Sequence, residues 1–568
     1  MNVAGLFELL AFLTIVTLLV KPLGSYVHRV FSGERTLLDG ILLPIERTIY
    51  RICRINSAYG MDALKYCKSF VLFSFSGCVL LYALLRLQSY FPWYDKNVLS
   101  SPTSPDLAFN TAVSFVTTST WQAYAGESTM SYWSQIAGLE GQNFLAGAAG
   151  LAVGIAFIRG FSSGDRTRVL GNFWQDLVRA TLWVLLPASI IGSLFLVWQG
   201  VPMNFLPYTH ATTVEGMPQL IAQGPVAALE FIKNLGTNGG GFFNANGAHP
   251  FENPTPLTNF VEMLAIAALP ASLTHVFGRV SGSIRLGWML YGVMVFLFVS
   301  GYFLTAVPEQ LGNPRITAAL HALPSMASPN MEGKEVRFGA ASSALTATVT
   351  SNCATGSTNS QHDSYLPLSG MIPLINMLLG EIVFGGLGTG IYSIMMIALI
   401  AVFVAGLMIG RTPEFLGRKI GAPEMKLVML FALASPVAIL LPVAAAVVLP
   451  AGLAGLTANT GPHGFTEIFY AYASCFANNG QSFAGLSSNL PFYNITTAFT
   501  MLFGRFALAI PALVLAEHFA RARRSLSPAA LPTDTFQFGA LVTFTALIVV
   551  GLGFLPALAI GPILERLM

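Results

Sequence analysis

The sequence predicts an all-α polytopic membrane protein with about ten transmembrane helices, built from four similar helix, pore-loop, helix units around a central pore. Three observations support this class: a low content of charged residues, ten long apolar stretches and four related loops. Of the 568 residues, 54% are hydrophobic and only 10% are charged, whereas a soluble domain carries roughly a quarter charged residues. A single soluble core is therefore excluded.

The ten apolar stretches are each long enough to cross a membrane, which takes about 20 mostly apolar residues. The first stretch has no basic segment before it and no small-residue cleavage site after it, so we interpret it as a membrane span and not as a signal peptide. The expected spans lie near residues 3–20, 69–85, 135–157, 180–199, 258–278, 286–306, 370–410, 427–450, 490–520 and 536–560.

The distribution of Lys and Arg predicts the orientation of the chain, because cations in short loops are retained on the cytoplasmic side. Most of the 29 cationic residues fall in alternate connections, of which 21–68 is the first and 521–524 the last. Both chain ends are therefore expected outside the cell. The four outer connections lie near 86–134, 200–257, 307–369 and 451–489, and each is too long to be a simple turn.

Each outer connection holds a short apolar segment followed by small polar residues, which is typical of a re-entrant half-helix and its loop. Without gaps, 119–126 (STWQAYAG) aligns with 478–485 (NNGQSFAG), and the other two loops contain TNGGG at 237–241 and ATGST at 354–358. Trp121, Gly239, Gly356 and Gly480 are taken as equivalent. The expected division is 1–60 for the first span and its connection, 61–160, 161–280, 281–411 and 412–525 for four repeats, and 526–568 for the last span.

Irregular loops at membrane depth must be buried in protein, because lipid cannot satisfy free N–H and C=O groups. Four such loops around one axis form a pore whose backbone carbonyls can replace the hydration shell of a cation. Glycine suits such a loop because it reaches φ values that other residues reach poorly. No ring of Asp or Glu indicates a divalent cation, so potassium is the natural candidate. Small polar residues also permit tight helix packing, and that alternative stays open for any single loop.

Several motifs resemble the family of potassium-binding subunits of the Kdp potassium-transporting ATPases (KdpA). The resemblance implies a multi-pass protein of the bacterial inner membrane, surrounded by lipid, that takes up external K⁺ with high affinity through its filter. It implies three partners: the P-type ATPase subunit KdpB, which uses ATP and Mg²⁺, and the subunits KdpC and KdpF. The matching stretches are 110–116 (NTAVSFV), 235–246 (LGTNGGGFFNAN), 249–254 (HPFENP), 331–335 (MEGKE), 410–414 (GRTPE) and 461–465 (GPHGF).

The same resemblance implies which residues form the selectivity filter. Gln122 matches a position that influences K⁺ affinity, and Trp121 stands where the other loops have glycine, so strict fourfold symmetry is not expected. The filter residues carried over are Thr118, Ser119, Thr120, Thr237, Asn238, Gly239, Thr355, Gly356, Asn478, Asn479 and Gly480.

Two charges fall inside apolar stretches, where an unpaired charge costs at least ~2.5 kcal/mol. Glu381 lies in the run 370–410, which would be about 60 Å long if straight and must therefore be broken, with the break expected at the glycines after Glu381. Arg505 lies in another span. We expect the two residues to approach each other below the filter, either to control the passage of K⁺ or as a structural ion pair. Arg411 is interpreted as a cytoplasmic anchor or as a contact with the ATPase partner.

Other functions find less support in the sequence. No GxxxxGK[ST] loop or DKTGT motif occurs, so this chain is not expected to hydrolyse ATP or to bind a cofactor. The charge balance, with 29 basic and 26 acidic residues, argues against nucleic acid as a partner. An autonomous K⁺ channel or an ion-gradient-driven symporter would fit the filter equally well. An intramembrane enzyme, or a metal site at His249, His362 or His463, lacks clustered ligands in the sequence.

Overall fold

Ten helices of this computed structural model are long and apolar enough to cross a membrane, by length and composition, within the described residues 3–95, 98–99, 103–162, 169–313, 316, 329–524 and 531–568. The expected class, all-α with about ten transmembrane helices, is confirmed. The spans are α1 (Val3–Ser32), α3 (Ala63–Arg86), Ser134–Gly160 with α6 (Gly141–Gly160), Phe173–Trp198 with α7 (Phe173–Arg179) and α8 (Leu186–Trp198), α10 (Pro256–Ser281), α11 (Ile284–Leu311), α15 (Thr389–Met408), α16 (Ala422–Val448), α19 (Pro491–Arg521) and Phe536–Leu567 with α20 (Phe536–Leu558) and α21 (Leu564–Leu567).

The helices differ in how much of their surface lies inside the protein. In the most apolar window, 83% of α10 and 78% of the α6 span are buried, against 28% of α1 and 22% of α3. The outer helices turn large apolar side chains outward, for example Phe7 on α1 and Leu552 on α20. The mostly buried α6 and α10 therefore form the centre of the molecule. Because lipid solvates apolar side chains as well as protein does, the more exposed α1, α3, α16 and α20 face lipid.

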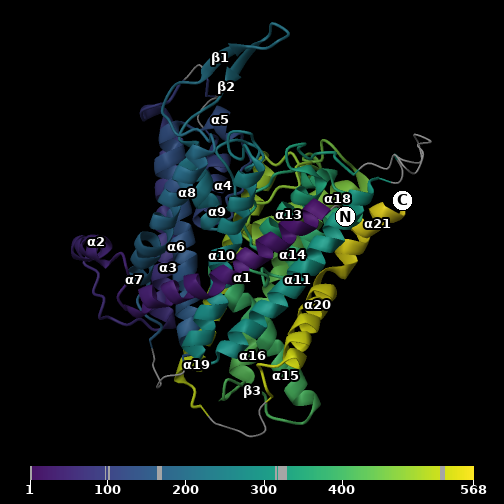
Figure 1. Cartoon of the computed structure of the whole chain (residues 1–568). Helices are drawn as coiled ribbons and strands as arrows, with labels where there is room; N and C mark the ends of the chain where they lie inside the picture. The colour runs from purple at the N-terminus through teal and green to yellow at the C-terminus, as the bar shows by residue number, and fades with distance from the viewer. Residues whose placement is uncertain are drawn as a thin grey trace.

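Four short helices lie among the long ones and provide the half-helices of the re-entrant segments (Figure 1). They are α4 (Pro105–Val116), α9 (Val226–Leu235), α13 (Gly339–Asn352) and α18 (Gly461–Phe476). Each is shorter than the roughly 20 residues that a membrane span needs. They are buried along most of their length, and α13 buries every residue from 340 to 352.

The long apolar run 370–410 is broken, as its length requires. Helix α14 (Pro367–Leu378) ends well before α15 begins, and residues 379–388 form the irregular connection. The connection is longer than the cluster of glycines indicated, and Glu381 lies inside it and not before it. Glu381 adopts a φ of 62° there, in the left-handed region that helices of L-residues avoid. The expected position of Glu381 ahead of the break is therefore wrong.

The two ends of the molecule differ (Figure 1). One end carries an antiparallel hairpin of β1 (Thr209–Thr212) and β2 (Pro218–Ile221), in which Thr209 pairs with Ile221. The other end carries the short pair β3 (Glu414–Phe415) and β4 (Arg418–Lys419) after α15. Helix α2 (Asp39–Ile52) lies at the side and follows α1. Both chain ends lie nearer to the level of α13 and α18 than to that of β3.

Candidate functional site

The four loops begin at the carboxyl ends of the four short helices. The C-cap residues are Thr117 after α4, Gly236 after α9, Cys353 after α13 and Ala477 after α18. The last carbonyl groups of a helix carry about half a negative elementary charge, which favours a cation nearby. Four helix ends therefore direct partial negative charge at the segments that follow them.

The backbone of the four loops follows one pattern after the C-cap. The first and third residues have positive φ, and the residue between them does not. The φ values are 66° and 47° at Thr118 and Thr120, 50° and 93° at Thr237 and Gly239, 51° and 79° at Ala354 and Gly356, and 52° and 61° at Asn478 and Gly480. Alternation between positive and negative φ turns successive peptide groups the same way, as stacked carbonyl rings require.

The loops meet in a closed ring, because the third residue of each touches the second residue of the next. An added Cβ on Gly239 would lie 1.8 Å from the Thr355 carbonyl oxygen. An added Cβ on Gly356 would lie 1.8 Å from the Asn479 carbonyl oxygen, and one on Gly480 would lie 2.0 Å from the Ser119 carbonyl oxygen. The fourth contact, between the first and second loops, is a hydrogen bond of 2.5 Å that the Thr120 hydroxyl donates to the Asn238 carbonyl oxygen.

This ring corrects the expected equivalence of the loops. Thr120, and not Trp121, occupies the position of Gly239, Gly356 and Gly480. The gap-free alignment matched Gln122 with Gln481, but in the ring Trp121 takes the place of Gln481, because the amides of these two residues lie against Gly480 and Gly356 in the same way. Trp121 packs behind the loop in an apolar cluster with Val113 and Met501.

The ring separates two cavities of very different size. The outer cavity has a volume of about 790 Å³ and is lined by Gln122 among others. The inner cavity has a volume of about 10 Å³, about the space of a single water molecule. The first loop residues Thr118, Thr237, Ala354 and Asn478 line it together with Glu381 and Arg505. Sequence reasoning missed Ala354, because its side chain is apolar and only the backbone pattern identifies it.

The broken segment between α14 and α15 lies directly against the inner side of the ring. The Leu387 amide donates a hydrogen bond of 2.8 Å to the Thr237 hydroxyl. Gly388 has a φ of 99°, and a Cβ there would lie 2.1 Å from the Gly150 carbonyl oxygen on α6. The Glu381 carboxylate accepts a hydrogen bond from the Thr389 hydroxyl. The irregular backbone is thus fixed to both the ring and a central helix.

Arg505 on α19 reaches the first loop and α6. Its guanidinium donates hydrogen bonds of 3.0 Å each to the Thr118 hydroxyl and to the Ala146 carbonyl oxygen. Arg505 and Glu381 line the same small cavity, but among the described residues no ion pair within 4.0 Å joins them. Arg411 lies elsewhere, exposed beyond the end of α15, where its amide donates 2.8 Å to the Gly406 carbonyl oxygen.

One cluster of titratable residues lies away from the ring. The two ring nitrogens of His463 lie 2.8 Å from Asp363 and 2.9 Å from Glu565. Ligand atoms of Asp363, His463 and Glu467 lie within 4.8 Å of one another. Because carboxylates hold both ring nitrogens, the hydrogen bonds raise the pKa of His463 to about 10. In its protonated form, His463 therefore forms an ion pair with each of these two carboxylates. The sequence did not reveal it, since these residues are far apart in the chain.

Among the described residues, ten helices able to span a membrane and four re-entrant loops that close one ring define a polytopic membrane protein with a central ring of loops. Residues 10–567 match the family described as "Potassium-transporting ATPase A subunit". A "Potassium-transporting ATPase potassium-binding subunit" from Methylobacterium nodulans is 51% identical and covers 100% of this chain and 98% of its own length. A protein of the same description from Mesorhizobium japonicum is 50% identical, with 100% and 99% coverage. The chain belongs to this family, KdpA.

Among solved structures, the chain is similar to the potassium transporter TrkH from Vibrio parahaemolyticus. The TM-score is 0.49 at 14% sequence identity, and the match covers 78% of this chain and 83% of that protein.

Proposed function

We propose that this chain is the K⁺-selective, non-catalytic subunit of an ATP-driven high-affinity potassium uptake complex. The observation that carries the proposal is the closed ring of four loops, in which alternating backbone conformation presents carbonyl groups at the ends of four helices. Membership of the KdpA family supports the same function. In this role, external K⁺ enters the filter from the outer cavity, and the energy for transport comes from a partner.

The filter residues that we propose are those of the ring, with Ala354 added. Carbonyl oxygens and hydroxyl groups suit a weakly hydrated monovalent cation, because they replace its hydration shell without a formal negative charge. The proposed set is Thr118, Ser119, Thr120, Thr237, Asn238, Gly239, Ala354, Thr355, Gly356, Asn478, Asn479 and Gly480.

We also propose that Glu381 and Arg505 control the passage of K⁺ below the filter. The inner cavity that they line is only about 10 Å³ in volume, so a K⁺ that leaves the filter comes close to both charges. Arg505 would repel the ion and Glu381 would attract it. This arrangement favours a sideways exit toward a partner over a straight path through the chain.

The assembly and its placement in the membrane are proposals as well. KdpB would hydrolyse ATP with Mg²⁺, KdpC and KdpF would complete the complex, and Arg411 would contact the ATPase partner at the end of α15. The membrane would be the bacterial inner membrane, with both chain ends outside. The four repeats would run from 61 to 525 with the divisions given above.

The test replaces Gly239 by Asp in the complete complex and titrates K⁺ and Na⁺ binding. Gly239→Asp adds a side chain to a residue with a φ of 93° whose Cβ would meet the Thr355 carbonyl, so selective K⁺ binding is expected to be lost. The matched control is Gly216→Asp in the turn between β1 and β2, where φ is 83° and no atom lies within 4 Å of the added Cβ. The control is expected to bind K⁺ like the unmodified protein. Unchanged discrimination in Gly239→Asp would contradict the proposed filter.

Reconstitution separates this function from that of an autonomous channel. K⁺ flux through the chain alone, without ATP, would favour the channel. Uptake only in the presence of the ATPase partner and ATP would favour the pump subunit.

A further inference from the structure

The second filter loop contains three consecutive glycines, Gly239 to Gly241. Glycine restricts the backbone less than any other residue, so this part of the ring cannot hold its carbonyl groups in place by local sterics. Side chains from other segments hold it instead. The Gln122 side chain accepts 2.8 Å from the Gly241 amide and donates 3.0 Å to the Gly241 carbonyl oxygen.

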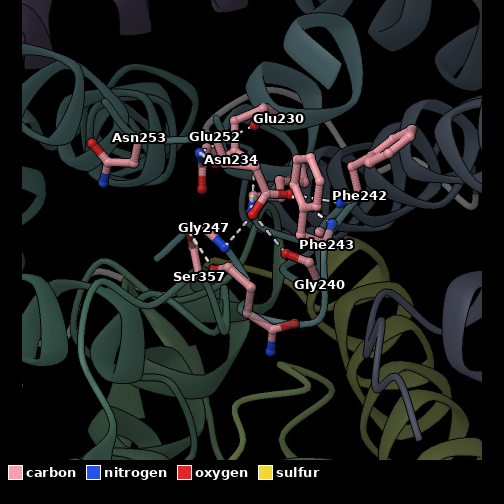
Figure 2. Close-up of polar contacts among 12 residues, drawn as sticks. Glu230, Asn234, Gly240, Phe242, Phe243, Gly247, Glu252, Asn253 and Ser357 are labelled. Atoms are coloured by element: carbon pink, nitrogen blue, oxygen red, sulfur yellow. Dashed lines mark hydrogen bonds and ion pairs between the residues drawn. The ribbon is translucent and has the colours of Figure 1, made fainter. Parts of the chain in front are cut away.

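Lys233 holds the carbonyl group of Gly240, which lies one residue closer to the filter than Gly241. Its ammonium donates a hydrogen bond of 2.8 Å to the Gly240 carbonyl oxygen and lies 2.6 Å from the Glu230 carboxylate. The side chains of Lys233 and Glu230 are both fully buried. Both residues lie on α9, the helix that ends at the filter, and Figure 2 shows Glu230 and Gly240 in this group of contacts.

A third side chain orders the loop beyond the glycines. The buried Glu252 carboxylate accepts hydrogen bonds from the amides of Phe242, Phe243 and Gly247, at 2.6, 3.2 and 2.8 Å (Figure 2). The charge of Glu252 also acts on Lys233. Buried charges are costly unless they are paired and hydrogen-bonded. Here the charges of Lys233 and Glu252 are both hydrogen-bonded to the backbone of the same loop.

We propose that Lys233 is a positioning residue for ion selectivity, which rests on the proposed filter function. Its ammonium carries the same single positive charge as K⁺ and binds the Gly240 carbonyl oxygen. This oxygen is therefore not free to bind the transported ion. In the second loop, only the carbonyl groups up to Gly239 therefore bind the ion, and their spacing stays suited to K⁺. Without the ammonium, the Gly240 peptide group can rotate. Its carbonyl oxygen can then move inward and bind a smaller, more strongly hydrated ion such as Na⁺.

The chain offers a matched control for the removal of a buried ion pair. Lys334 lies 2.7 Å from Glu309, and both side chains are again fully buried. The Lys334 ammonium also donates a hydrogen bond of 3.2 Å to the Glu332 carbonyl oxygen, which does not belong to the filter. Loss of this pair removes a similar interaction and leaves the filter loop untouched.

The experiment compares Lys233→Met with Lys334→Met in the complex with the ATPase partner. Dissociation constants for K⁺ and for Na⁺ are measured by calorimetric titration, and the readout is the selectivity ratio, the dissociation constant for Na⁺ divided by that for K⁺. Because a hydrogen bond to a charged group is lost at the filter, the ratio is expected to fall roughly tenfold in Lys233→Met. Lys334→Met is expected to lose thermal stability with the ratio unchanged. An unchanged ratio in Lys233→Met overturns the proposal.

Lys233→Met leaves Glu230 buried without its cation, which can prevent folding. In that case the pair is replaced together, as Glu230→Leu/Lys233→Met, because removal of both charges is often neutral for stability. Glu309→Leu/Lys334→Met is the corresponding control. A fall in the ratio only in the first pair supports the proposal, and equal ratios overturn it. Absence of selective K⁺ binding in the unmodified protein would instead refute the filter function itself.

Discussion

Single residues make the ring unequal. Three loops have glycine where the chain comes closest to its neighbour, but the first has Thr120. A β-branched residue in the left-handed region is strained by roughly 1–2 kcal/mol. The Thr120 hydroxyl compensates with its bond to Asn238, which closes the ring between the first and second loops. The contact between the first and second loops is therefore made by a side chain, and the other three contacts are close approaches of the backbone.

His463 is expected to stabilise the protein in a pH-dependent way. Its pKa is raised from 6.5 to about 10 by bonds to Asp363 and Glu565. The folded protein thus holds the proton more tightly than the unfolded chain, and this stabilisation is complete below pH 6.5 and disappears as pH rises toward 10. His463→Ala should lower the free energy of unfolding by roughly 1–3 kcal/mol near pH 6.

Melting temperatures of the solubilised protein between pH 6 and pH 10.5 check this expectation. The difference between the unmodified protein and His463→Ala should shrink as pH rises. His210→Ala, on the exposed face of β1, is the control and should show no difference. A difference that grows with pH would contradict the assignment of a charged His463.

At the scale of elements, sequence patterns predicted the helices but not the register of the first loop. Apolar length gave the ten spans and the break after α14, because each depends on hydrophobicity along the chain. The backbone φ values that align Thr120 with Gly239 depend on contacts between loops 118 residues apart. Identity of Gln122 with Gln481 favoured a different alignment. Only the closed ring distinguishes the two.

An exchange of Glu381 and Arg505, the two charges in the inner cavity, tests whether they form a simple ion pair. Arg505 bonds to Thr118 and Ala146, whereas Glu381 bonds to Thr389 on the helix after the break. Since each has its own partners, the double variant Glu381→Arg/Arg505→Glu is expected to transport K⁺ no better than either single variant. ATP-driven K⁺ uptake by reconstituted complexes measures this. Recovery to the unmodified rate would show a structural ion pair.

At the scale of the whole molecule, composition settles the class of protein but not the side chains that hold the site. Low charge and ten spans follow from the solvent that surrounds the outer helices. The bonds from Lys233 to Gly240 and from Gln122 to Gly241 follow from packing between segments. A buried lysine in an apolar helix was a signal that could have been noticed, because a buried charge needs a partner. Its partner could not be read from the sequence.

The expected orientation of the molecule predicts which side of the membrane exposes its accessible thiol. Of the five cysteines, Cys53 is exposed, Cys78 is half-buried in α3, and the others are buried. Cys53 follows α2 in a connection that is expected in the cytoplasm because of its many positive residues. A membrane-impermeant maleimide should therefore label Cys53 in inverted vesicles and not in intact spheroplasts.

The matched variant moves the thiol to the opposite end of the molecule. Cys53→Ser/Glu215→Cys places it in the exposed turn between β1 and β2, at the end where the outer cavity opens. It should be labelled in intact spheroplasts and not in inverted vesicles. Because a single spanning helix more or less would put these two sites on the same side, the opposite labelling of the pair also tests the number of spans between them. Labelling of Cys53 from outside would reverse the expected orientation and, with it, the direction from which K⁺ is proposed to enter the ring.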